Sequence, residues 1–265
     1  MGPKRVCGYQ CLPGGLPMRS FKTLASAALL STAAIAFAAP SSALTVVIDD
    51  FSDAAQSITR TSAGTTTLLD NLPGGGAFCS SIIGCYRDMA TTSTVHPGMP
   101  ARAVEAMVDT STGTFVHSQE AGVIAQTRLT WDGLAGAGLG ADLSLLDQFV
   151  LEVVSSDLSI EWELTVDDGT TSYTHEFLAS SFTITGVNFQ VELPLSIWSS
   201  KGVDLSSVKS ISLLANGAQK GFPNGLPSVD TEIAFFAVTQ VPEPAMLALF
   251  GLGLLGLGAA ARRKA

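Results

Sequence analysis

Regular alternation of apolar and polar side chains is the feature that most constrains the fold of this chain. In residues 160–166, polar side chains separate Ile160, Trp162, Leu164 and Val166. The same period of two recurs in the segments 123–131, 187–193, 211–215 and 229–237. Successive side chains of a strand point to opposite faces of a sheet, so this pattern is typical of antiparallel sheets with one buried face.

Shorter segments extend the pattern, and turn residues separate them. Further strands are predicted at 44–49, 56–60, 103–109, 113–118, 147–154 and 172–178, with turn signals such as Asp167-Asp168-Gly169 between strands. Residues 61–101 are rich in Thr, Ser, Gly and Pro, and we expect long connections there. No segment shows helical periodicity with caps. We therefore predict an all-β, two-sheet antiparallel β-sandwich over residues 44–240, with a jelly roll as the leading form.

Charge separates this strand-rich body from the two ends of the chain. Of the 14 basic and 23 acidic residues, 7 basic and 22 acidic lie between 44 and 241, which leaves the body a net charge of −15. Such a body repels phosphate backbones, which argues against nucleic acid as a partner.

The N-terminal end has the anatomy of a secretory signal. A basic start at Met18 is followed by an uncharged stretch from Thr23 to Ala39 and then by small residues. We predict a signal peptide over residues 18–43, cut by signal peptidase after Ala43, with a cut after Ala38 as the alternative. Residues 1–17 do not fit this anatomy. We interpret them as lying upstream of the true start, and a leader extension is the alternative.

The C-terminal end combines three features in a fixed order. Val241-Pro242-Glu243-Pro244 precedes an uncharged stretch from Ala245 to Ala261, and Arg262-Arg263-Lys264 follows it. As a helix, this stretch would be about 25 Å long, slightly short of a usual membrane span. Its basic end is expected on the cytoplasmic side. A plain single-pass anchor with a chance prolyl motif is the alternative.

This C-terminal segment, residues 241–265, resembles the PEP-CTERM sorting signal of Gram-negative bacteria that make exopolysaccharide. The resemblance rests on the Pro-Glu-Pro motif, the Gly/Leu-rich stretch and the basic tail. It implies export and processing at the Pro-Glu-Pro region by exosortase, a membrane enzyme with a cysteine nucleophile. The tail is then a substrate, and it does not reveal the role of the body.

The body resembles galactose-binding-like jelly rolls, a fold that many carbohydrate-binding modules use. The likeness lies in the opening residues 47–52 and in the segments 193–195 and 202–211. It implies that a last strand at 229–238 returns beside the first. In such domains the first and last strands often share a structural Ca²⁺. Hard oxygen ligands suit Ca²⁺, and the candidates here are Asp49, Asp50, Asp53, Asp230 and Glu232. Simple surface acidity is the alternative.

Two cysteines and a few aromatic residues are further candidates. Cys79 and Cys85 are separated by five residues, and in an exported protein they favour a small disulfide loop over free thiols or a metal site. Trp131 and Trp162 lie on apolar faces and are predicted to be buried. The candidates for stacking on a sugar ring are Trp198, Tyr86 and Tyr173.

Catalytic patterns are weak in this sequence. His96, His117 and His175 lack partners at metal-ligand spacing, and no G-x-S-x-G elbow occurs. Glu161 and Glu163 share one face of a strand, as a glycosidase pair could, but a solvated sheet face explains them as well. We therefore predict a non-catalytic protein of the cell surface or exopolysaccharide matrix, with a structural or adhesive role and no required cofactor. The alternatives are a specific carbohydrate-binding module and a glycan-active enzyme.

Overall fold

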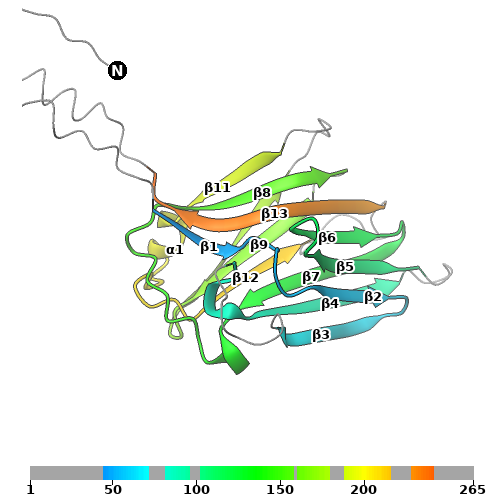
Figure 1. Ribbon diagram of the computed structural model, residues 1–265, viewed down its shortest axis with the longest axis horizontal. Helices are drawn as coiled ribbons and strands as arrows, with labels where there is room; N and C mark the ends of the chain where they lie inside the picture. Colours follow the sequence, from blue (N-terminus) through cyan, green and yellow to red (C-terminus); the bar gives the residue numbers. More distant parts are fainter. Residues whose placement is uncertain are drawn as a thin grey trace, which may run out of the picture. The chain divides into compact units, whose positions relative to one another are not determined.

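Two antiparallel sheets account for almost all of the regular structure (Figure 1). The computed structural model describes residues 44–71, 81–95, 102–157, 160–179, 188–215 and 228–241. Every strand pairing in these residues is antiparallel. Helical structure in the same ranges is confined to the short turns η1 (Ile83–Cys85), η2 (Leu134–Gly136) and α1 (Ser196–Ser199). The predicted all-β sandwich is confirmed.

The first sheet, sheet A, has the strand order β11-β8-β13-β6-β5-β2, and β1 pairs with β13. Its strands are β1 (Thr45–Asp49), β2 (Gln56–Arg60), β5 (Val104–Asp109), β6 (Thr114–Gln119), β8 (Gln148–Ser156), β11 (Phe189–Pro194) and β13 (Val229–Thr239). The pairing of β1 with β13 confirms that the last strand returns beside the first.

The second sheet, sheet B, has the order β10-β9-β12-β7-β4-β3. Its strands are β3 (Gly64–Asn71), β4 (Arg87–Val95), β7 (Val123–Trp131), β9 (Ile160–Asp167), β10 (Ser172–Ala179) and β12 (Ser210–Ala215).

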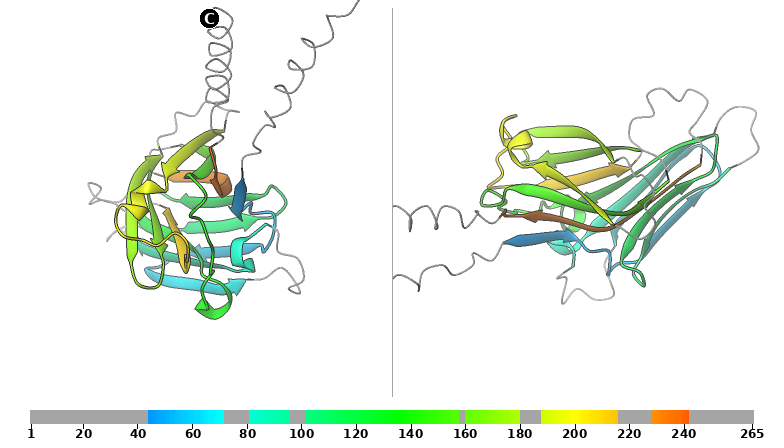
Figure 2. Two further views of the ribbon diagram at one scale, coloured as in Figure 1. Left: turned by 90° about the vertical axis from the view of Figure 1, so that its left-hand side faces the viewer. Right: turned by 90° about the horizontal axis from the view of Figure 1, so that it is seen from above.

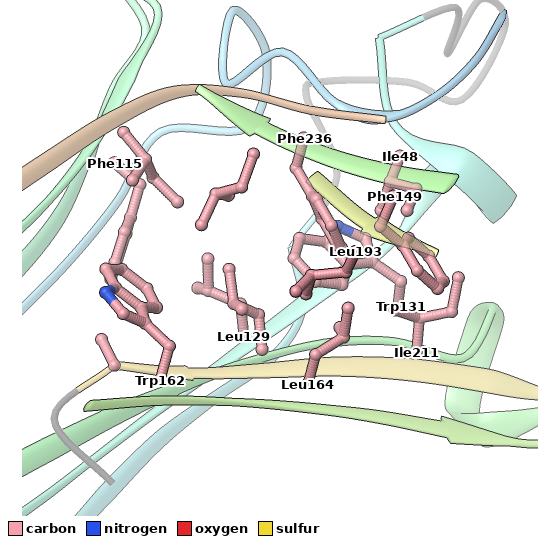
Figure 3. Close-up of a cluster of buried hydrophobic side chains, with 14 of the residues drawn as sticks. Ile48, Phe115, Leu129, Trp131, Phe149, Trp162, Leu164, Leu193, Ile211 and Phe236 are labelled. Carbon is pink, nitrogen blue, oxygen red and sulfur yellow. The ribbon is translucent and has the colours of Figure 1, made fainter. Parts of the chain in front are cut away.

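The apolar face of each alternating strand points between the sheets (Figure 3). On β7 and β9, every second residue is buried. Trp131 and Trp162 are fully buried, as predicted. The Trp131 ring lies 5.4 Å from the ring of Phe236 in sheet A, centroid to centroid. Burial of these side chains is the main favourable term for a sandwich of this kind.

The prediction for residues 61–101 was wrong over β3 and β4. These strands lack apolar alternation because polar side chains occupy inward positions on β4, where Thr91 and Ser93 are buried. The Thr91 hydroxyl is hydrogen-bonded to that of Thr127 at 3.1 Å, and the Ser93 hydroxyl donates to the Ser62 carbonyl at 2.8 Å. Threonine is β-branched and favours strands. The threonine content of β3 and β4, rather than their periodicity, was therefore the feature that indicated strands.

A buried ion pair joins the start of the body to sheet B. Arg87 Nη1 lies 2.6 Å from Asp49 Oδ2, and both side chains are fully buried. The same carboxylate accepts hydrogen bonds from Trp131 Nε1 at 2.9 Å and from the Phe51 amide at 2.8 Å. Burial raises the pKa of the Asp49 carboxyl, and the Arg87 guanidinium and these donors act in the opposite direction. The pair is therefore stable only as a complete network.

Arg87 also holds the irregular backbone that follows β1. Its Nη2 donates to the carbonyl of Ala54 at 2.5 Å and to that of Asp53 at 3.2 Å, and its Nε donates to Gln56 Oε1 at 2.8 Å. Phe51 and Ala54 have φ values of 55° and 61°, in the left-handed region that non-glycine residues rarely adopt. The guanidinium satisfies the carbonyls that this conformation leaves inside the protein.

His117 is the fully buried histidine of β6. Its Nδ1 lies 2.9 Å from the hydroxyl of Thr127 across the sandwich. Burial disfavours the imidazolium and lowers the pKa of His117 to about 4, against a lesser opposite effect of Gln119 and Asp230. This histidine is therefore a neutral core residue at pH 7.

We predict that Arg87→Met lowers the free energy of unfolding by about 3–5 kcal/mol, because it leaves the Asp49 carboxylate buried without its partner. Urea denaturation of residues 44–241 measures the loss. Arg128→Met is the control, since Arg128 is only half-buried. Adding Asp49→Leu to Arg87→Met should restore part of the stability. A cost for Arg87→Met no greater than that of the control would contradict the prediction.

We also predict an acid-sensitive stability that His117 causes. The unfolded chain binds a proton on this histidine near pH 6.5 and the folded protein near pH 4. The stability is therefore complete above pH 6.5 and is lost as the pH falls towards 4. Between pH 6.5 and 5 the loss should be about 1.5 kcal/mol. Denaturation at several pH values measures this slope, which His117→Gln should remove. If His175→Gln removes it instead, the assignment to His117 is incorrect.

Candidate functional site

The two ends of the described chain leave the sandwich side by side (Figure 2). Thr45 on β1 faces Thr239 on β13, and the Gln240 amide donates to the Leu44 carbonyl at 2.8 Å. The next amide, that of Val241, donates to Asp147 Oδ2 at 2.7 Å. The backbone therefore stays anchored up to the first residue of the predicted sorting motif.

The rest of that motif lies beyond the described residues. Val241 is described and is 48% exposed. Pro242, Glu243 and Pro244 and the basic residues Arg262, Arg263 and Lys264 lie outside the described ranges. No helix in the described part of the chain combines the length and the hydropathy of a membrane span.

An open groove of about 590 Å³ lies beside this exit. Its polar lining includes the carboxylates of Asp147 and Asp204 and several serine hydroxyls, and leucines and Val203 supply the apolar part. Asp147 thus contributes both to the groove and to the anchoring of Val241.

Two identical tripeptides contribute to the groove, one through Ser144 and the other through all three of its residues. In Asp142-Leu143-Ser144, Asp142 Oδ1 accepts bonds from the Ser144 amide at 2.9 Å and the Ser144 hydroxyl at 2.6 Å. Residues 204–206 repeat this turn, with the corresponding bonds at 2.9 and 2.7 Å. The Leu143 amide donates to the Leu205 carbonyl at 2.8 Å, which joins the turns. We did not predict this pair, and the repeated Asp-Leu-Ser sequence was the signal that could have indicated it.

Asp168 joins the β9–β10 turn to the second of these tripeptides. Its carboxylate accepts hydrogen bonds from the Asp204 amide at 2.7 Å and from the Thr170 hydroxyl and amide and the Thr171 amide. These donors, the Asp204 amide first, hold the pKa of the Asp168 carboxyl well below its usual range. At neutral pH, Asp168 is therefore a structural residue whose carboxylate joins the two loops by hydrogen bonds.

The five acidic residues predicted as calcium ligands are not brought together. Asp49 is used by Arg87, and it faces Phe236 on β13. Asp230 faces Ser118 on β6. Asp230 lies six positions before Phe236 on β13, a distance of about 20 Å at the rise of a strand. Within the described ranges, no three His, Cys, Asp or Glu side chains lie close enough to hold a metal ion. A single calcium site built from all five residues is therefore not formed.

The other three carboxylates of that set have separate surroundings. Asp50 Oδ1 accepts from the Ser52 hydroxyl at 2.6 Å, and Asp53 Oδ2 accepts from the Ser81 hydroxyl at 2.5 Å. Glu232 is half-buried on β13. Each of the two aspartates thus stabilises a local turn or contact.

The aromatic candidates for sugar stacking also lie in different settings. Trp198 is fully buried; its Nε1 donates to the Tyr173 carbonyl at 3.0 Å, and its ring packs on Phe149 and His175. It therefore offers no ring face to a ligand. Tyr173 is half-buried at the edge strand β10, with the Lys201 ammonium 5.5 Å from its ring centroid. Tyr86 is half-buried just before β4.

Cys85 is disulfide-bonded in the turn η1 that precedes β4. Cys79 lies outside the described residues, so the pairing of these two cysteines stays a prediction. His96 also lies outside them. His175 is half-buried on β10, with its ring stacked 6.5 Å from that of Phe177.

The outer face of sheet B carries the Glu161 and Glu163 pair and a row of hydroxyl groups. The cross-strand register aligns one row that consists of Thr174, Thr165, Ser212 and Thr130. The next row consists of Glu176, Glu163, Leu214 and Arg128. Arg128 Nη1 donates to the Ser212 hydroxyl at 3.0 Å, which links the rows. We name the residues of these two rows the hydroxyl face.

Comparison with known proteins gives two findings. The chain is similar to the family 11 carbohydrate-binding module from Clostridium thermocellum in complex with a beta-1,3-1,4-mixed-linked tetrasaccharide, at 12% identity and a TM-score of 0.36, over 75% of this chain and 97% of that one. It is also similar to a family 29 module complexed with cellulohexaose, at 9% identity and a TM-score of 0.32, over 74% and 91%. No curated protein matches the chain.

The second finding concerns the C-terminal end. Residues 240–264 match the model of the PEP-CTERM protein-sorting motif. The match begins at Gln240, the residue that follows β13. Residues 240–264 therefore carry the PEP-CTERM protein-sorting motif that their sequence indicated.

Proposed function

We propose that this chain is the precursor of an exported surface or matrix protein that exosortase processes. Signal peptidase removes residues 18–43, the helix at 245–261 holds the intermediate in the inner membrane, and exosortase acts at Pro242-Glu243-Pro244. The remaining sandwich, a jelly roll, has a non-catalytic structural or adhesive role in exopolysaccharide. The match of residues 240–264 to the sorting motif carries this proposal.

The position of the motif supports processing at this point. β13 ends at Thr239 and the Val241 amide is still bonded to Asp147, so the motif follows the folded body without a linker. Proline restricts itself and the residue before it to extended forms, and an extended peptide is what a protease binds. A cut after Val241 leaves every strand of the sandwich intact.

The use of the acidic side chains supports a non-catalytic body. Asp49 is saturated by Arg87, Trp131 and Phe51, and Asp168 by four donors of two loops. Carboxylates held in this way stabilise the fold.

The hydroxyl face favours polysaccharide binding as a second candidate function. Threonine and serine hydroxyls both donate and accept, and Glu163 and Arg128 add charged hydrogen-bonding groups on the same sheet. Sugar hydroxyls are matched by such groups. The aromatic residues of β10 alternate with its outward residues, so binding here would rest on hydrogen bonds rather than on stacking.

We predict that replacing Pro242 and Pro244 by alanine blocks processing in cells that contain exosortase. The variant should accumulate as membrane-bound protein that retains residues 245–265, which intact-mass spectrometry detects. The control is Pro194→Ala, since Pro194 is exposed at the end of β11. Mature wild-type protein that keeps its C-terminal stretch would contradict the proposal.

For the second candidate function, a glycan array of residues 44–241 is the measurement. A neutral polysaccharide should bind, and Glu163→Ala should weaken binding by about tenfold or more, the effect of one lost charged hydrogen bond. Glu105→Ala, an exposed position on sheet A, is the matched control. An array without selective binding would contradict polysaccharide binding as a function and leave the structural role as the remaining candidate.

A further inference from the structure

Exposed apolar side chains gather where the two ends of the body leave the sandwich. Six large hydrophobic side chains of the described residues are exposed, and three of them lie at this end. They are Leu44 at 49% exposure, Leu145 at 73% and Val241 at 48%. We name these three residues the exit rim.

Hydrogen bonds of the backbone and of the Asp147 side chain hold the exit rim together. The Leu44 carbonyl accepts from Gln240, and the Val241 amide donates to the Asp147 carboxylate. The Asp147 amide in turn donates to the Thr239 carbonyl at 2.9 Å, and Leu145 lies two residues before Asp147. These hydrogen bonds therefore bring three segments that are distant in sequence, and that carry Leu44, Leu145 and Val241, to one end of the sandwich.

The sequence on either side of the exit rim indicates what lies against it. Only Pro242, Glu243 and Pro244 separate Val241 from the apolar stretch that begins at Ala245. The four residue steps from Val241 to Ala245 span at most about 14 Å. If the stretch crosses the membrane, as the proposed function states, this end of the sandwich is held within that distance of the bilayer surface.

We propose that the exit rim is a membrane-contact surface, and that in the precursor its three side chains lie in the interface of the bilayer. This proposal rests on the proposed function, because the C-terminal helix supplies the tether. Tethering keeps the local concentration of lipid high, so a small apolar contact is sufficient.

The charge around the exit rim defines the kind of lipid. The groove beside it carries the carboxylates of Asp147 and Asp204. Carboxylates repel anionic headgroups over about 8 Å at physiological salt. The surface therefore suits neutral, zwitterionic lipid, and anionic lipid should weaken the contact.

The chain offers a matched control position. Leu178 on β10 is 67% exposed, close to the exposure of Leu145. It faces Glu161 near the start of β9. β9 begins just after β8, which ends at Ser156. Ser156 faces Thr231 on β13, and Thr231 lies eight residues before Thr239, where β13 ends at the exit. Leu178 thus lies towards the opposite end of the sandwich.

The test uses residues 44–265, the intermediate that signal peptidase would leave, in phosphatidylcholine vesicles whose acyl chains carry bromine, which quenches tryptophan fluorescence. Leu145→Trp and Leu178→Trp are compared, and the native tryptophans Trp131, Trp162 and Trp198 are fully buried and form a constant background. Interfacial side chains lie roughly 5–10 Å into the boundary of headgroups and acyl chains, so the tryptophan added at position 145 should be quenched at least about twice as strongly as the one added at position 178. Equal quenching would overturn the proposal.

Flotation of the same vesicles separates this proposal from the one on which it rests. If the precursor floats with the vesicles and both added tryptophans are quenched equally, the exit rim does not contact lipid. The proposal that the C-terminal helix anchors the protein in the membrane is then unaffected. If the precursor does not float, the membrane-anchored intermediate itself is wrong. Replacing a fifth of the phosphatidylcholine by phosphatidylglycerol should reduce the quenching at position 145; an increase would contradict the proposed lipid preference.

Discussion

The buried ion pair of Asp49 and Arg87 is the interaction on which the start of the body depends. It joins the first strand of sheet A to β4 of sheet B, and its guanidinium also satisfies the carbonyls of the strained segment after β1. Trp131 in the core donates to the same carboxylate. Loss of either charge would leave its partner without water or protein to compensate it, so the geometry of β1 follows from the completeness of this network.

With β1 held in this way, its partner β13 determines where the chain leaves the body. Among the described strands, β1 pairs with β13. Leu44, which follows the predicted signal peptide, and Gln240, which precedes Val241, are therefore hydrogen-bonded neighbours. Leu44 and Val241, which adjoin the two proposed cleavage sites, therefore lie at one end of the body, which also bears the groove.

Much of the fold could be predicted because alternation reports burial directly. Strands such as β7 and β9 place an apolar residue at every second position, and both were predicted almost to their ends. β3 and β4 were missed, since hydrogen bonds between Thr91 and Thr127 replace apolar contact at inward positions. For the site, the sorting motif is linear and was readable. The roles of Asp49 and Trp198 were not, because an acidic residue looks like a surface ligand until its buried partner Arg87 is known, and an isolated Trp looks available until Phe149 covers it.

The sequence by itself determined the sheet class of the body, its acidity and the sorting motif at residues 240–264, because periodicity, charge and short linear motifs are properties of neighbouring residues. Only the tertiary structure decided which carboxylates are structural, which aromatic rings are covered, and that the segments of Leu44, Leu145 and Val241 meet at one end of the sandwich. Those properties depend on contacts between residues far apart in the chain, where strand register and packing decide the neighbours.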